Sequence, residues 1–300
     1  MASFGEQKLL LKSDRKLIGI RPGRNVEEVI LTYDNGITIC DIDHKKVKRS
    51  LSIGKGQQFT ASCIYNNRDD EYVVVQEGIV IRTFNEQSFN NGQRFTVNVP
   101  IYEITADCDN HDSAVVFNNG NVLTLEAVLE NPSGIPSTDP LVGNILFCKL
   151  LTNLTSVMCI QEDNNSFLVF GNGYQNNEKS KIQFQYRACE LRSVCVHCSS
   201  PQVIKVFSLW SDGSVCETSI SFPDNVGLPV EFVNIKEFQN KSISGNNMVS
   251  LSSDCIALVA QESGDYREVS VIDTKFGMCH HTISSLPLST KIYTTGHNLY

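Results

Sequence analysis

The sequence predicts an all-β fold, a β-propeller with degenerate WD40-like four-stranded blades. Six times along the chain, a β-rich run reaches a short glycine-containing turn and a second β-rich run follows. The turns recur at roughly 40 to 53 residues, and the first three lie about 42 apart, which is the period of a propeller blade. A pair of β-sandwiches is the alternative, but sandwiches lack a fixed repeat of this length. The six turns are Asp34–Gly36, Gln76–Gly78, Asn118–Gly120, Gly171–Gly173, Ser211–Gly213 and Ser263–Asp265.

In the first hairpin, Val29–Tyr33 is expected to pair with Ile37–Cys40. Asn35-Gly36 between them favours a type I′ turn, whose positive φ values these two residues tolerate. First strands that are apolar throughout suit positions covered on both faces, and alternating second strands suit positions nearer to water. The other five hairpins are expected to pair Tyr72–Val75 with Ile79–Ile81, Ala114–Phe117 with Val122–Leu125, Phe167–Phe170 with Ile182–Tyr186 across a longer Asn-rich loop, Val206–Trp210 with Val215–Thr218, and Ile256–Val259 with Val269–Ile272.

Helical signals are sparse. The strongest predicts a short helix over Leu125–Glu130, stopped by Pro132. The Pro- and Gly-rich residues 131–143 and the Ser/Asn-rich residues 239–247 are expected to be loops. The Trp-Asp pair of common propeller repeats does not occur, but Cys40-Asp41 and Ile272-Asp273 stand at its position.

We predict one domain over residues 1–300, with seven blades, six being the alternative. The hairpins account for six blades, and the chain ends can supply a seventh. Strand-like segments occur at Leu9–Leu11 and Leu17–Ile20, and again at Lys291–Tyr300. Joining both ends in the last blade would close the ring and remove two exposed sheet edges.

Composition supports a folded core and narrows the class of protein. Hydrophobic residues make up 41% of the chain, enough for a sizeable core. We expect neither a transmembrane helix nor a secretory signal, and eleven scattered cysteines then indicate buried thiols in a reducing compartment. The net charge of −8 argues against a surface that wraps nucleic acid. Residues 1–50 nevertheless hold ten Lys/Arg against seven Asp/Glu, so one edge can be locally basic.

Two clusters could in principle bind a metal. Cys195 and Cys198 flank His197 at a spacing that zinc sites use, but no second Cys-x-x-Cys completes a site, and a strand with buried thiols is the simpler interpretation. Adjacent His280 and His281 would point to opposite faces of a strand. No nucleophile elbow, P-loop or dinucleotide motif occurs, so we predict no enzyme activity, cofactor or small-molecule substrate.

The one basic run, His44–Arg49, contributes Lys45, Lys46, Lys48 and Arg49. It predicts either a nuclear-import signal or a contact patch for phosphates or an acidic partner. The alternative is a solvated strand end between blades, where lysines also discourage edge pairing. Aromatic residues do not interleave with the run, so a base-stacking RNA site is not indicated.

Several segments, in this order, resemble the N-terminal propeller of the nucleolar protein 11 family. Each is weak alone, and their order and spacing carry the resemblance across residues 50 to 220 and more loosely to the end. The segments are Gly56–Thr60, Glu71–Val75, Gly78–Asn85, Leu125–Pro132 and Ser211–Thr218.

The resemblance implies a nuclear and nucleolar scaffold in the early, transcription-linked sub-complex of the small-subunit processome. It implies support of pre-rRNA transcription and of 18S maturation, with other propeller and helical processome subunits as partners and only minor or indirect contact with pre-rRNA. It implies no catalytic residue and no membrane. Family members continue into a helical C-terminal region that these 300 residues lack. A propeller scaffold in trafficking or in a ubiquitin-ligase adaptor is the alternative function, and a zinc protein using Cys195 and Cys198 is a further one.

Overall fold

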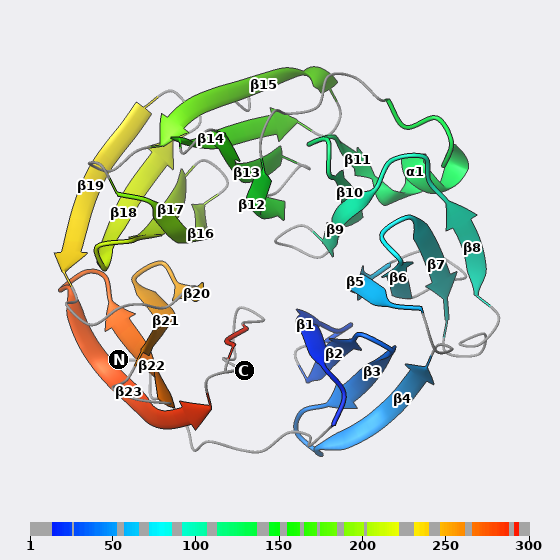
Figure 1. Ribbon diagram of the computed structural model, residues 1–300, viewed down its shortest axis with the longest axis horizontal. Helices are drawn as coiled ribbons and strands as arrows, with labels where there is room; N and C mark the ends of the chain where they lie inside the picture. Colours follow the sequence, from blue (N-terminus) through cyan, green and yellow to red (C-terminus); the bar gives the residue numbers. More distant parts are fainter. Residues whose placement is uncertain are drawn as a thin grey trace. The chain divides into compact units, whose positions relative to one another are not determined.

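The computed structural model describes residues 14–25, 27–52, 57–65, 72–85, 92–106, 113–136, 144–150, 155–162, 165–172, 175–184, 189–200, 203–221, 231–239, 247–261, 266–287 and 291–293. They fall in two compact units, Met1–Thr96 and Val97–Tyr300. Each unit consists of antiparallel sheets in which strands that follow one another in the chain pair side by side (Figure 1). Within these described ranges, no helix has the length and apolar character needed to cross a membrane.

The first unit holds two four-stranded sheets. In both, the second strand is wholly buried and the fourth is largely exposed, as expected for inner and outer strands of a blade. The first sheet contains β1 (Leu17–Pro22), β2 (Glu28–Tyr33), β3 (Gly36–Asp41) and β4 (Lys46–Ser52). The second contains β5 (Phe59–Ile64), β6 (Tyr72–Gln76), β7 (Val80–Phe84) and β8 (Gln93–Thr96).

The two sheets of the first unit pack against each other through the inner strands, because β5 contacts both β1 and β2. The Thr32 and Ser62 hydroxyls share a hydrogen bond of 2.6 Å across this contact. Tyr72 Oη donates to Glu28 Oε1 at 3.1 Å from the second sheet to the first. These two bonds identify which faces of the sheets meet.

The first hairpin forms where the sequence predicts it, but not with the predicted turn. Tyr33 pairs with Gly36, and neither Asn35 nor Gly36 has a positive φ, so the expected type I′ turn is wrong. A Cβ at Gly36 would instead collide with the Leu51 carbonyl oxygen. Glycine is therefore needed here for the close approach of β4. The alternating pattern of β3 does not mark a strand that faces solvent either, since Thr38 is only 1% exposed.

The second unit begins with a three-stranded sheet and the predicted helix. Its strands are β9 (Ile101–Ala106), β10 (Ser113–Phe117) and β11 (Val122–Thr124). Helix α1 (Leu125–Glu130) follows at once, as predicted, and the Thr124 hydroxyl caps it by accepting from Ala127 N at 3.2 Å. The helix buries Leu125 and Val128.

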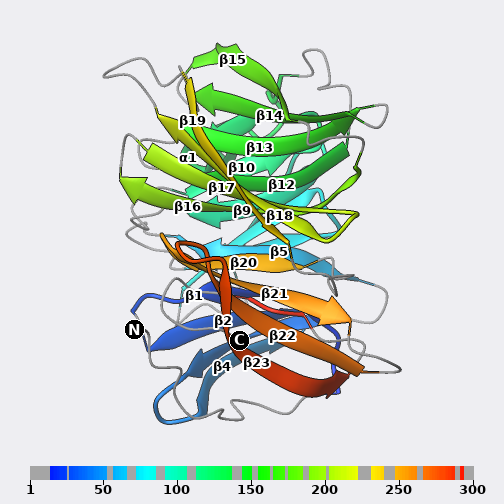
Figure 2. The same cartoon turned by 90° about the vertical axis from the view of Figure 1, so that its left-hand side faces the viewer.

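Three four-stranded sheets complete the second unit. Their strands are β12 (Asn144–Leu150), β13 (Thr155–Glu162), β14 (Asn165–Asn172), β15 (Gln175–Phe184), β16 (Leu191–Ser200), β17 (Val203–Trp210), β18 (Ser214–Ser221), β19 (Glu231–Gln239), β20 (Met248–Ser252), β21 (Cys255–Gln261), β22 (Tyr266–Asp273) and β23 (Met278–Pro287). Figure 2 shows the twist of these sheets from the side, with β19 running steeply across the direction of β16.

Successive sheets of the second unit pack face to face, and their first strands adjoin. β12 contacts β9 and β16, and β16 contacts β20. One apolar cluster joins β13 and β14 to β16–β18 around Phe170, Trp210 and Ile220, and another joins β16–β18 to β20–β22 around Phe207 and Leu258. Lys205 reinforces the latter contact by donating to Ser253 O at 2.8 Å and to Asp254 Oδ1 at 2.9 Å.

Two predictions about hairpins and ends need correction. The expected long loop before Ile182 is strand instead, because Asn172 already pairs with Gln175. That hairpin joins the third and fourth strands of its sheet, whereas the other five predicted hairpins join the second and third strands of theirs. Leu17–Ile20 belongs to β1, which pairs with β2, and so is not part of a closing blade. Leu9–Leu11 and residues 294–300 lie outside the described residues, as do 137–143 and 240–246 of the predicted loops.

The aspartates that stand at the Trp-Asp position close similar turns. Asp41 ends β3 and accepts from His44 N at 2.9 Å, and Asp273 ends β22 and accepts from Lys275 N at 2.8 Å. Each turn then has one residue with positive φ, Lys45 at 50° and Gly277 at 66°. Asp41 and Asp273 therefore occupy equivalent positions in their turns, although neither follows a tryptophan.

Candidate functional site

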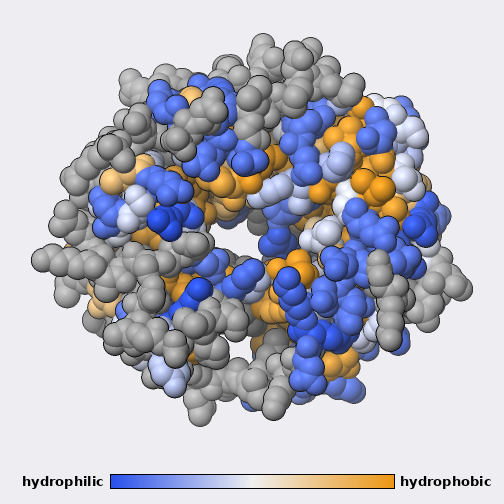
Figure 3. Space-filling model, in the orientation of Figure 1, coloured by the Kyte–Doolittle hydropathy of each residue, from blue (hydrophilic) through white to orange (hydrophobic). Residues whose placement is uncertain are grey.

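The basic run lies on the outer strand of the first sheet. Residues 46–50 of β4 are exposed, and Lys45 ends the turn before them. Lys45, Lys46 and Arg49 form no ion pair with any residue in the described ranges. Figure 3 shows that the surface over this sheet is mostly hydrophilic. These three side chains are therefore available to a partner.

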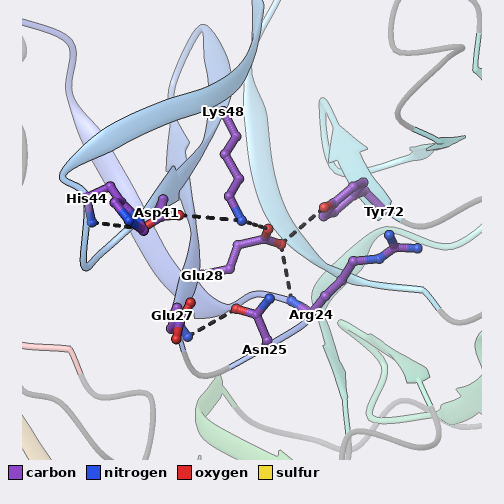
Figure 4. A network of polar contacts seen from close by, with 8 residues as sticks. All are labelled: Arg24, Asn25, Glu27, Glu28, Asp41, His44, Lys48 and Tyr72. Atoms are coloured by element: carbon purple, nitrogen blue, oxygen red, sulfur yellow. Dashed lines mark hydrogen bonds and ion pairs between the residues drawn. The ribbon is translucent and has the colours of Figure 1, made fainter.

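Lys48 differs from its neighbours because it turns toward the protein. The pairing of β3 with β4 shifts between Ile39 and Cys40, so that Lys48 stands as an extra residue between Val47 and Arg49. Its ammonium lies 3.1 Å from Glu28 Oε2 and 3.9 Å from Asp41 Oδ2 (Figure 4). The hydrogen bond to Glu28 raises the pKa of Lys48. Because of the bulge, one of the four predicted cations, Lys48, forms a structural ion pair with Glu28.

Glu28 is the centre of this network and was not singled out by the sequence. Its side chain is only 4% exposed and accepts from Lys48 Nζ, from Tyr72 Oη and, at 3.2 Å, from Arg24 N. The Arg24 guanidinium lies over the Tyr72 ring, 5.8 Å from its centroid. A carboxylate with both oxygens engaged is a structural anchor rather than a free base. A glutamate at the start of an apolar run is the signal that could have revealed it.

Asp41 and His44 form the outer part of the network. Asp41 Oδ1 lies 3.0 Å from His44 Nδ1, and the backbone hydrogen bond from His44 is the main cause that lowers the pKa of Asp41. The Glu27 backbone N–H meanwhile donates to Asn25 Oδ1 at 3.1 Å. These contacts hold the turn that leads into β4.

Cys195 and Cys198 do not come together. Both are on β16 in regular register, three positions apart, and so face opposite sides of the sheet. Cys195 packs in the cluster with Phe207 and Met248, whereas Cys198 packs against the cluster with Trp210. Burial raises the pKa of the Cys195 thiol to about 12. Within the part of the chain that is described, no three His, Cys, Asp or Glu side chains gather as a metal site would need.

Solved structures with a similar fold include a β-propeller domain. The β-propeller domain of Myceliophteria thermophila Cps50 (Swd1) superposes with a TM-score of 0.61 and 11% identity, covering 91% of this chain and 87% of that one. Raptor from Chaetomium thermophilum gives 0.63 and 15% identity, covering 96% of this chain and 27% of that one. At this identity the likeness concerns the fold alone, and this chain has the β-propeller fold that the sequence predicts.

Sequence comparison gives relatives of one kind. Nucleolar protein 11 from Bos taurus is 25% identical over 302 residues, which cover 94% of this chain and 41% of the relative. The protein from Gallus gallus is 24% identical, covering 91% and 40%. A nucleolar protein 11-like protein from Danio rerio is 30% identical over 123 residues, covering 40% and 17%. The chain thus spans about two fifths of the Bos taurus and Gallus gallus relatives.

The family described as the nucleolar protein 11 N-terminal domain matches residues 1–300. The match covers both compact units and all the described sheets. By this match the chain belongs to the nucleolar protein 11 N-terminal domain family.

Proposed function

We propose that this chain is a nucleolar, non-enzymatic β-propeller scaffold that acts in ribosome biogenesis. Its membership of the nucleolar protein 11 family over residues 1–300 is the observation that carries the proposal. In the finer form of the proposal, the chain belongs to the small-subunit processome. There it supports pre-rRNA transcription and 18S maturation, with other propeller and helical subunits as partners and little direct RNA contact.

Polar contacts within and between the sheets support a scaffold. Glu28 anchors sheet to sheet in the first unit, and Lys205 joins Asp254 and Glu217 in the second, at 2.9 and 3.3 Å. Such pairs fix the arrangement of sheets and leave the loops and outer strands to present contact surface. The mechanism is rigid display of several surfaces at once.

We further propose that the sheets belong to one propeller of seven blades, six being the alternative. Because Leu17–Ile20 is used in β1, the seventh blade would draw on Leu9–Leu11 and Lys291–Tyr300. A cryo-electron microscopy map of the chain that resolves strands would count the blades, and a closed ring of six would remove the need for those end segments.

We also propose that the basic run acts in its folded state as a contact patch. Reading it as a linear import signal would require β4 to leave β3 and the Lys48–Glu28 pair to break. Lys45, Lys46 and Arg49 need no such change, because they are exposed on the strand and its turn.

Two experiments in cells test the function: expression of a tagged copy of this chain, and depletion of the cell's own protein. A tagged copy of residues 1–300 should concentrate in nucleoli and recover processome proteins on affinity purification. Depletion of the endogenous protein should slow the pulse-labelled appearance of 18S rRNA relative to 28S rRNA. Diffuse cytoplasmic signal, or recovery of trafficking or ubiquitin-ligase proteins in place of processome proteins, would contradict the proposal.

A further inference from the structure

Two arginines face each other across the outer strands of the second sheet. Arg82 on β7 pairs directly with Arg94 on β8. Like charges in directly opposed cross-strand positions repel and destabilise a sheet. Arg82 is half-buried, and burial, followed by the charge of Arg94, lowers the pKa of Arg82. Neither arginine forms a hydrogen bond or ion pair in the described part of the chain.

The register shows which way this pair points. Ser62, Val74, Arg82 and Arg94 are paired in one row across β5, β6, β7 and β8, so their side chains share a face. Ser62 is hydrogen-bonded to Thr32 of the first sheet. The arginine pair therefore lies on the face that meets the first sheet.

The same argument places cations of the first sheet on the matching face. Thr32 shares its face with Glu28, whose cross-strand row continues through Asp41 to Lys46. The next row on that face continues through Ile39 to Arg49. Lys46 and Arg49 are exposed and, like the arginine pair, lack an acidic partner among the described residues. We call Lys46, Arg49, Arg82 and Arg94 the basic margin of the first unit.

The acidic groups on this face are already occupied. Glu28 is held by Lys48, Tyr72 and the Arg24 backbone, and Asp41 is held by His44 and Lys48. Four cations, two from each sheet, thus lie on the facing sides of the two sheets, and no acidic side chain among the described residues pairs with them. The chain as a whole nevertheless has a net charge of −8. An anion brought by another molecule would relieve the repulsion between Arg82 and Arg94 and form charge-assisted bonds with their planar guanidinium groups.

We propose that the basic margin binds an extended acidic segment of a partner protein, whose Asp or Glu carboxylates lie between the two outer strands. A peptide fits better than RNA for two reasons. Within the described ranges, β4 and β8 each pair with one strand, so a peptide backbone can complement both the N–H and the C=O groups of their outer edges, whereas phosphates can only accept from the N–H groups. The four margin residues also include no aromatic side chain on which bases could stack. The inference stands on this geometry and does not depend on the nucleolar role.

The test measures binding of a fluorescein-labelled peptide of alternating Glu and Ser to the purified 300-residue chain by fluorescence anisotropy. The variant is Arg82→Gln with Arg94→Gln. The control is Arg192→Gln with Lys275→Gln, which removes the same charge from the second unit, where both residues are exposed. Loss of two charge-assisted contacts should weaken peptide binding by about tenfold or more, whereas the control should stay within about twofold.

A second readout separates lost binding from lost folding. Arg94→Gln alone removes the cross-strand repulsion, so its Tm should equal or exceed that of the parent chain while peptide binding weakens. Equal binding by parent and double variant would overturn the proposal, as would an equal loss in the control. Oligouridine of matched length that binds more tightly than the peptide would assign the margin to RNA instead. A lower Tm for Arg94→Gln would show that the arginine pair has a structural role.

Discussion

At the scale of single residues, Glu28 shows how a buried charge organises its surroundings. Three donors from three segments converge on one carboxylate, and one of them, Tyr72, comes from the neighbouring sheet. Burying a carboxylate without such partners would cost far more than burying an apolar side chain. The three hydrogen bonds together therefore offset the cost of burying the Glu28 carboxylate.

Replacing Glu28 by Ala should destabilise the chain by about 2 kcal/mol, since Tyr72 Oη loses its acceptor while Lys48, partly exposed, can turn to water. Glu28→Gln should cost less, because an amide oxygen can still accept from Tyr72. Urea unfolding followed by circular dichroism measures both. Lys46→Ala, at an exposed residue that has no ion pair among the described residues, serves as the control. Equal stability of Glu28→Ala and the parent would refute the anchoring role.

The cysteines give a second residue-scale prediction. Burial raises the pKa of Cys148, Cys159 and Cys195 to about 12, whereas Cys279 is exposed. Because the thiolate is the reactive form, iodoacetamide at pH 8 should label Cys279 in the native protein and leave Cys195 unmodified. Peptide mass spectrometry reads the sites. Labelling of Cys195 that begins only after a chelator is added would instead indicate a bound metal.

At the scale of elements, sequence patterns located most strands because turn chemistry and apolar runs are local signals. The α1 helix was found from its apolar spacing and Pro132, and both its ends agree. The hairpin after Phe170 pairs the predicted segments, since Leu168 pairs with Ile182, but it joins the third and fourth strands of its sheet. In the sequence, only Asp163 and Asn164 separate β13 from β14, so no glycine marks this connection.

The site was less predictable, since it depends on contacts between distant residues. The sequence groups Lys48 with its neighbours in the run, and nothing local shows that a bulge turns it toward Glu28. Arg82 and Arg94 are far from that run in sequence. Only the strand register and the Thr32–Ser62 hydrogen bond place them on the face that meets the face of Arg49. A linear pattern cannot contain this information.

The contact between the β16–β19 and β20–β23 sheets should depend on pH through Asp254. The hydrogen bond from Lys205 lowers the pKa of Asp254 from its ordinary value of 3.8. A carboxyl with a lowered folded-state pKa adds stability above its unfolded pKa, and this contribution disappears as pH falls through the folded value. Asp254→Asn should therefore lower Tm at pH 7 and converge with the parent below about pH 4. Parallel Tm curves for the two proteins from pH 7 to pH 3 would contradict this.

At the scale of the whole molecule, an acidic chain has in its first unit four cations, Lys46, Arg49, Arg82 and Arg94, that lack an acidic partner among the described residues. Charge of this kind acts on the rate and choice of association more than on the fold. Substitutions in these cations should therefore change the binding of partners without changing the localisation of the chain in the cell.

A tagged chain carrying Lys46→Gln and Arg49→Gln should still reach the nucleolus but recover fewer partner proteins. Fluorescence microscopy and quantitative mass spectrometry of the purified complexes measure the two properties in one cell line. The double substitution Arg192→Gln with Lys275→Gln is the matched control. Loss of nuclear signal with the first variant, and not with the control, would restore the import-signal interpretation.

Lys45 occupies, with φ at 50°, the position in its turn where the corresponding turn of the second unit has Gly277. Glycine would take up this conformation without strain, while a lysine there costs about 1 kcal/mol. A lysine at this position lowers the intrinsic stability of the turn and places an ammonium group on the surface. Directed evolution of the chain for heat resistance alone should accordingly replace Lys45 by glycine early, and retention of the lysine under selection for growth would reveal what that ammonium contributes to fitness.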